Sequence, residues 1–258
     1  MKMKLFKYIG YLLFILLSLN SCVNEMNIME NEIVPEINNK GLDVSNPIIK
    51  KIIDYEGKEP SDEVIRIEKI LDLLYKIVPQ AETVIDYLVK NNLKVRIHIG
   101  SVSGSNMTSW YKSSYPPEIG FDHSIYITDA NVLHELLHFY TTNAYSIYRG
   151  QPNACEEYEV RVLTDLLMHK YYDTTGFKYQ GMRNDDILYA SYKKWINDIV
   201  RSESYDIMVF KNGFKMYGTF CIQNFAHSDR PDVVNFNESE LNRYTPTLMQ
   251  ELWFNYKR

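Results

Sequence analysis

Apolar residues recur at helical spacing along much of the chain. Those at positions 64, 67, 71, 74 and 78 repeat every three or four residues, after the good capping residue Ser61 and before Pro79. This pattern predicts a helix over 61–78. The same reasoning predicts further helices over 80–91, from Asp129 through about residue 140, over 154–172 and over about 184–201.

Alternating apolar and polar residues mark the candidate strands. The alternation over 95–99 predicts a strand that is half-exposed on one face, and 124–128 predicts a second short strand. Residues 100–120 hold many Ser, Gly and Pro residues and predict a long loop. Several helices with a few short strands predict an α+β fold. We expect a small twisted sheet packed on the helix that begins near Asp129, followed by a mainly helical C-terminal part.

The N-terminal residues form a candidate export signal. Three lysines fall within the first seven residues, and the apolar stretch Ile9 to Leu19 that follows is short for a membrane span. Cys22 comes directly after this stretch. The arrangement resembles a bacterial lipoprotein signal, which implies that Cys22 is lipidated and becomes the new N-terminus. An ordinary signal peptide or an uncleaved anchor, with Cys22 incidental, is the alternative.

This resemblance implies a three-part organisation. Residues 1–21 are expected to be the signal peptide, 22–60 a lipidated N-terminus and polar tether, and 61–258 the globular domain. The lipid implies an extracytoplasmic protein held at a bacterial membrane, on the outer membrane or the cell surface.

Charge narrows the classes of partner. The chain has 28 basic and 33 acidic residues, and removal of residues 1–21 takes away three lysines and no acid, which leaves 25 against 33. A net charge near −8 argues against nucleic acid as a partner, because nucleic-acid binding relies on basic surface.

The run His134-Glu135-Leu136-Leu137-His138 is the strongest chemical motif. Histidines four residues apart lie on one face of a helix, so both imidazoles can reach one zinc ion. Glu135 can then take a proton from water at the open position of the metal. The motif predicts a Zn²⁺ cofactor, with His134 and His138 as ligands and Glu135 as general base.

A third ligand is expected from the next helix. Glu156, Glu157 and Glu159 open that helix, and its apolar face alone does not decide among the three. The run from Glu157 to residue 163 resembles the corresponding run of the ImmA/IrrE-type zinc peptidases and, more loosely, of a membrane-linked group of gluzincins. That resemblance implies that Glu157 is the ligand, 23 positions after His134.

The resemblance also implies a zincin-like metallopeptidase domain that acts on peptide or protein substrates. In such domains the strand before the motif helix usually borders the cleft and binds extended substrate by strand addition. One departure concerns Arg161, because the family keeps an acid or amide at that position to orient a ligand histidine. The histidine then needs another acceptor, and Asp129, Asp165 or a backbone carbonyl are the candidates.

Gluzincins usually add a Tyr or His that donates a hydrogen bond to the reacting carbonyl oxygen. His227, in a polar run near the C-terminus, is the candidate histidine. The candidate tyrosines are Tyr140, Tyr145, Tyr148, Tyr158 and Tyr171.

Two other functions compete with a lipid-anchored metallopeptidase. One is a catalytically inactive surface lipoprotein that uses a zincin scaffold as a binding module, although the intact Glu135 argues against it. The other is a structural or interaction domain in which the histidine motif is coincidental.

Overall fold

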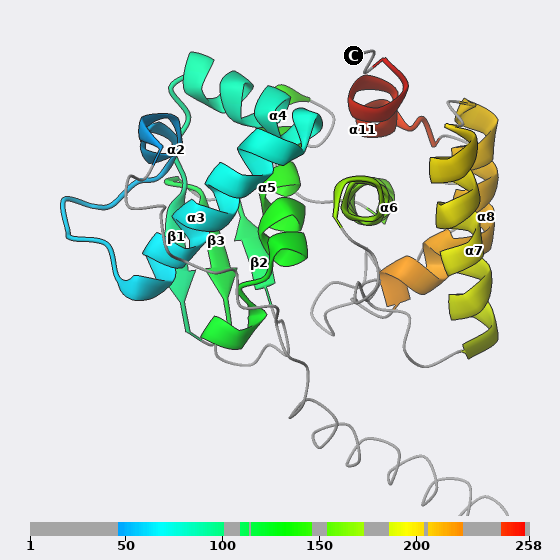
Figure 1. Ribbon diagram of the computed structural model, residues 1–258, viewed down its shortest axis with the longest axis horizontal. Helices are drawn as coiled ribbons and strands as arrows, with labels where there is room; N and C mark the ends of the chain where they lie inside the picture. The colour runs from blue at the N-terminus through cyan, green and yellow to red at the C-terminus, as the bar shows by residue number, and fades with distance from the viewer. Residues whose placement is uncertain are drawn as a thin grey trace, which may run out of the picture. The chain divides into compact units, whose positions relative to one another are not determined.

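Helices form most of the structure, a computed structural model that describes the following residues: 46–100, 109–113, 115–145, 154–172, 186–203, 206–223 and 244–255. The fold is α+β, with one small three-stranded sheet beside the helices (Figure 1). The expected signal peptide, Cys22 and most of the expected tether lie outside the described residues. Within the described part of the chain, no helix combines the length and the apolar character that crossing a membrane requires.

The globular unit begins earlier than the predicted residue 61, since it spans Val44–Arg258. Helix α2, Pro47–Ile52, is capped by Asn46 and buries both Ile49 and Ile52 completely in the core. The predicted tether over 22–60 is therefore too long at its C-terminal end. A helix of six residues is too short to reveal itself by helical periodicity.

The next two helices confirm the sequence pattern. Helix α3 spans Asp62–Ile77, and the Ser61 hydroxyl accepts a hydrogen bond from the Val64 N–H at its first turn. Helix α4 spans Pro79–Lys90 and starts with proline, whose missing N–H costs nothing at that position. Both helices bury one apolar face in the core.

The sheet has three strands in the order β1-β3-β2. Strand β1, Arg96–Ile99, confirms the predicted strand and pairs in parallel with β3, Glu118–Phe121. Strand β2, Ser109–Lys112, pairs antiparallel with β3 and forms one edge of the sheet.

Two predictions about this region are wrong. The segment 100–120 is not only a loop, because it contains β2 and the start of β3. The predicted strand at 124–128 is a 3-10 turn at Ser124–Tyr126, followed by the buried Ile127. Strands of four residues give too few alternations to stand out among Ser, Gly and Pro residues.

Helix α5, Asp129–Ala144, occupies the centre of the unit. Thr128 caps it, and every residue from Val132 to Thr141 is buried. Helix α5 contacts α3, α4, β2 and β3, and α6 covers a further side of it. Side chains on all faces of α5 therefore lie in the protein interior, including both histidines of the motif.

The C-terminal part is mainly helical, as expected. Helix α6 spans Ala154–Tyr171, α7 spans Asp186–Ser202 and α8 spans Ile207–Gln223. Helix α6 packs against α5 and against α7 and α8, so it lies between them (Figure 1). The last described segment comprises α11, Thr247–Met249, and the π-helical turn Gln250–Phe254.

Gly120 lets Trp110 lie across the sheet. The two residues are paired in register between β3 and β2, and a Cβ atom on Gly120 would lie 2.0 Å from Cε2 of Trp110. Gly120→Ala is therefore expected to lower the free energy of unfolding by about 1–3 kcal/mol, as overpacking does. Urea denaturation followed by circular dichroism measures this loss.

Trp110→Ala provides the matched background for that measurement. Without the indole ring the added methyl group has space, so Gly120→Ala is expected to change the stability of the Trp110→Ala protein by less than about 1 kcal/mol. Equal losses in both backgrounds would show that the indole is not the cause.

Candidate metal centre

Helix α5 points both imidazoles of the motif at the same place. His134 and His138 are one helical turn apart, and their Nε2 atoms lie 3.1 Å from each other. The two residues are only 6% and 4% exposed, so both rings are shielded from bulk water. A pair of imidazole nitrogens this close in the interior needs a proton or a cation between them.

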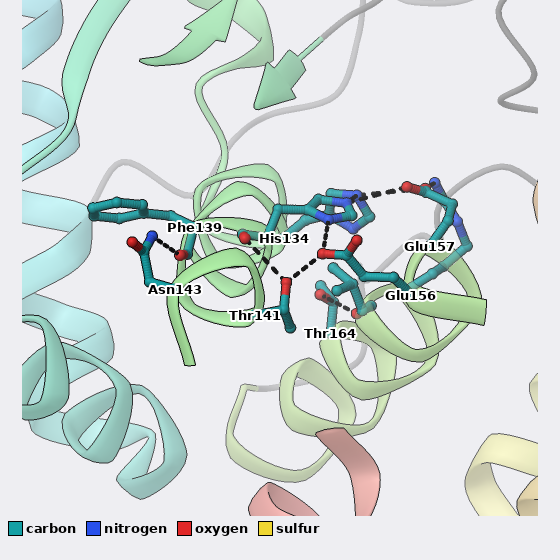
Figure 2. A network of polar contacts seen from close by, with 10 residues as sticks. His134, Phe139, Thr141, Asn143, Glu156, Glu157 and Thr164 are labelled. Carbon is teal, nitrogen blue, oxygen red and sulfur yellow. Dashed lines mark hydrogen bonds and ion pairs between the residues drawn. The ribbon is translucent and has the colours of Figure 1, made fainter. Parts of the chain in front are cut away.

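Glu157 on α6 closes the site from the opposite side. Its Oε2 lies 3.1 Å from Nε2 of His138, and its Oε1 lies 3.6 Å from Nε2 of His134. Figure 2 shows the glutamates of α6 reaching toward the imidazoles of α5. These three side chains form a group whose ligand atoms could hold a metal ion.

The dimensions of this triangle suit a small divalent cation. A tetrahedral site with metal–ligand distances of about 2.1 Å separates neighbouring ligand atoms by about 3.4 Å. The imidazole nitrogens are 3.1 Å apart, and each lies 3.1 or 3.6 Å from a different oxygen of Glu157, Oε2 for His138 and Oε1 for His134. These separations bracket that value. Two imidazoles and one carboxylate are also a donor set that binds zinc.

Glu156 orients His138. Its Oε1 lies 3.1 Å from Nδ1 of His138 and also receives a hydrogen bond from the Thr141 hydroxyl (Figure 2). Glu156 is completely buried. A carboxylate on Nδ1 fixes the tautomer and the orientation of the ring, so that Nε2 faces the site.

Sequence reasoning did not identify this acceptor. It proposed Asp129, Asp165 or a backbone carbonyl, whereas Asp165 accepts a hydrogen bond from the Tyr192 hydroxyl at 2.7 Å. Glu156 directly precedes the candidate ligand Glu157, and this position was the signal that could have identified it as the acceptor. For the other histidine, Nδ1 of His134 has no hydrogen-bond partner among the described residues.

Glu159 has a different role from its two neighbours. It is completely buried, and its Oε2 accepts a hydrogen bond from the backbone N–H of Met249 at 3.0 Å. Glu159 thereby attaches the C-terminal segment to α6. Of the three glutamates left open by the sequence, Glu157 is thus the one that meets both imidazoles.

Arg161 contacts the candidate ligand carboxylate. Its Nη2 donates a hydrogen bond to Oε1 of Glu157 at 2.8 Å, and the residue is 1% exposed. The two charged side chains are one turn apart on α6. Burial acts to raise the pKa of Glu157, but His134 and His138, with a smaller contribution from the guanidinium, hold it well below its usual range.

Glu135, the candidate base, lies beside the metal group. It is 3% exposed, and its Oε1 accepts a hydrogen bond from the Ser109 hydroxyl at 2.7 Å. Burial raises the pKa of Glu135 to about 7, although His138 and the Ser109 hydroxyl oppose this rise. Ser109 escaped sequence reasoning because it lies in the segment taken for a loop.

Strand β2 contributes a second side chain to this region. Tyr111 lies two residues after Ser109 on the same face of the strand, and its ring is parallel to the His138 ring, with 6.5 Å between centroids. The edge strand therefore borders both the base and one candidate ligand.

Most of the tyrosines considered as hydrogen-bond donors to the reacting carbonyl oxygen donate to other groups of the protein. The hydroxyls of Tyr140 and Tyr145 both donate to Glu251, near the C-terminus, and the Tyr158 hydroxyl donates to the Phe210 carbonyl at 3.2 Å. The ring of Tyr171 lies beneath the Lys170 ammonium group. Tyr148 and His227 lie outside the described residues.

Comparison of the chain with protein-family models, curated proteins and solved structures found no match. The function proposed below therefore rests on the chemistry and geometry of this chain's own side chains.

The three glutamates are expected to differ sharply in metal binding. Glu157→Ala should weaken zinc binding by at least about 100-fold because it removes a ligand, and Glu156→Gln by about 10-fold because it disturbs the partner of His138. Competition with a chromophoric chelator measures both affinities.

Glu159→Gln is the matched control for these variants. Its side chain faces the C-terminal segment, so zinc affinity should stay within about 3-fold of wild type while stability falls by about 1–3 kcal/mol. A loss of zinc in Glu159→Gln as large as that in Glu157→Ala would contradict the assignment.

Burial of Glu135 should make the metal-free protein less stable as the pH rises. Between its usual pKa of 4.5 and the folded value of about 7, folded Glu135 keeps a proton that the unfolded chain releases. Stability therefore falls through this window, by about 3 kcal/mol when complete, and no further above it.

Glu135→Gln removes this titration. The stability of the variant minus that of wild type should increase by about 3 kcal/mol from pH 4.5 to pH 8, measured by urea denaturation with a chelator present. Parallel pH profiles for the two proteins would show that Glu135 is not a buried ionisable group.

Proposed function

We propose that this chain is an extracytoplasmic, lipid-anchored zinc metallopeptidase that hydrolyses peptide bonds with Glu135 as general base. The observation that carries the proposal is the buried group of His134, His138 and Glu157 with Glu135 beside it. Catalytic zinc sites commonly use three protein ligands of these types and keep a further position for water or substrate.

Each side chain has a defined task in this proposal. Bound zinc supplies the Lewis acidity that polarises the scissile carbonyl group and activates water. Glu135 takes a proton from the attacking water and passes it to the leaving amine. The hydrogen bond from Ser109 orients the Glu135 carboxylate, and Glu156 orients His138 as a ligand.

The edge strand supports a peptide as substrate. An extended peptide can add to the outer edge of β2 by main-chain hydrogen bonds. Ser109 and Tyr111 of the same strand contact Glu135 and His138, so the added peptide would lie on the strand that borders the candidate base. The strand expected directly before α5, at 124–128, is a 3-10 turn, and the strand that precedes this turn, β3, is central in the sheet. The proposal therefore gives the role of bordering the cleft to the edge strand β2.

Three further features agree with a zincin-like peptidase. The small sheet packs on the motif helix α5, and the next helix supplies the third candidate ligand. The lipid anchor and the extracytoplasmic location rest on the leader sequence and on Cys22. The net charge near −8 without the leader fits a peptide substrate better than a nucleic acid.

Glu135→Gln tests the mechanism. The variant should bind zinc as wild type does, because Glu135 is not a ligand, and should lose about 10²–10⁴-fold in kcat/KM, because general base catalysis is removed. Hydrolysis of a quenched-fluorescent peptide library, with products identified by mass spectrometry, measures the loss.

The controls separate the competing functions. Glu82→Gln, on α4, should keep full activity, and a chelator should abolish wild-type activity until zinc is restored. Full activity of Glu135→Gln would refute the mechanism. Zinc binding without hydrolysis of any peptide would favour the inactive binding module, and absence of zinc binding would favour a structural domain.

A further inference from the structure

Arg161 is a buried charge with no role in the function proposed so far. It is 1% exposed and lies in the middle of α6, where a guanidinium group is costly unless it is paired. Its Nη2 donates to Oε1 of Glu157 at 2.8 Å.

The contact makes the two oxygens of Glu157 unequal. Oε1 accepts the hydrogen bond from Arg161 and lies 3.6 Å from Nε2 of His134. Oε2 lies 3.1 Å from Nε2 of His138. The guanidinium therefore occupies part of the acceptor capacity of Oε1, while Oε2 faces Nε2 of His138.

Charge balance gives the guanidinium a second effect. Three carboxylates lie near the two imidazoles, with Glu135 and Glu156 buried and Glu157 partly buried. A divalent cation offsets two negative charges, and Arg161 offsets the third. Uncompensated charge in a protein interior is strongly unfavourable, so the set is complete only with the guanidinium.

We propose that Arg161 is a positioning residue that restricts Glu157 to ligation through one oxygen, which keeps a coordination position open. The inference rests on the proposed metal function and deepens it. A carboxylate that is free to turn can bind zinc with both oxygens, and the second oxygen would then fill a position that water or substrate needs.

Arg161→Met, in the full chain, tests the inference without an activity assay. The readout is the visible absorption of the Co²⁺-loaded protein, which is intense for four-coordinate Co²⁺ and weakens as ligands are added. Wild type should show the intense bands. In Arg161→Met, two-oxygen binding by Glu157 should lower their intensity by at least about twofold.

Arg96→Met is the matched control, because Arg96 is also an ion-paired arginine but lies on β1, with Asp54 and Glu56. Its Co²⁺ spectrum should equal that of wild type. An unchanged spectrum in folded, Co²⁺-loaded Arg161→Met would overturn the inference and leave the proposed function standing. Absence of Zn²⁺ and Co²⁺ binding in wild type would instead remove the proposed function itself.

If Arg161→Met does not fold, X-ray absorption of the zinc-loaded wild type tests the inference by measuring the number of ligand atoms around zinc. Four nitrogen or oxygen neighbours at about 2.0–2.2 Å are expected when Glu157 binds through one oxygen. Five or more neighbours in the absence of substrate, with both oxygens of Glu157 bound, would overturn the inference.

Discussion

The cost of burying charge governs the arrangement between α5 and α6. Two imidazoles and the carboxylates of Glu135 and Glu156 are buried, the carboxylate of Glu157 is partly buried, and each needs a partner in the protein or a cation. The contacts of Glu156 with His138 and of Arg161 with Glu157 meet part of this need. A divalent ion at the imidazoles would balance the remaining charge. The same side chains therefore determine both the stability of the interior and the ability of the site to bind a metal.

The parts of the fold that the sequence predicted are those set by local pattern. Helices α3 to α7 follow apolar periodicity. The histidine pair can be recognised in the sequence because both residues belong to one helix. The choice among Glu156, Glu157 and Glu159 depends instead on how α6 packs against α5 and the C-terminal segment, which no local pattern contains. Strand β2 was missed because four residues around Trp110 and Tyr111 carry too short an alternation.

A glycine and two side-chain contacts position the edge strand β2 against α5. Gly120 leaves room for Trp110 on one face of β2, and on the other face Ser109 and Tyr111 reach Glu135 and His138. The same four-residue strand therefore joins the sheet to α5. Packing of Trp110 fixes its position on one face, and the hydrogen bond from Ser109 to Glu135 fixes it on the other.

The last described turns of the chain tie the two ligand-bearing helices together. Glu251 accepts hydrogen bonds from the hydroxyls of Tyr140, on α5, and of Tyr145, which directly follows α5. Met249 donates its N–H to Glu159 of α6. These contacts join residues 90 to 111 positions apart in the sequence. A chain that ends after α8 would thus carry all three candidate ligands yet lack the contacts that hold α5 and α6 to the C-terminal segment. The geometry of the candidate metal centre therefore depends on residues that lie far from it in the sequence.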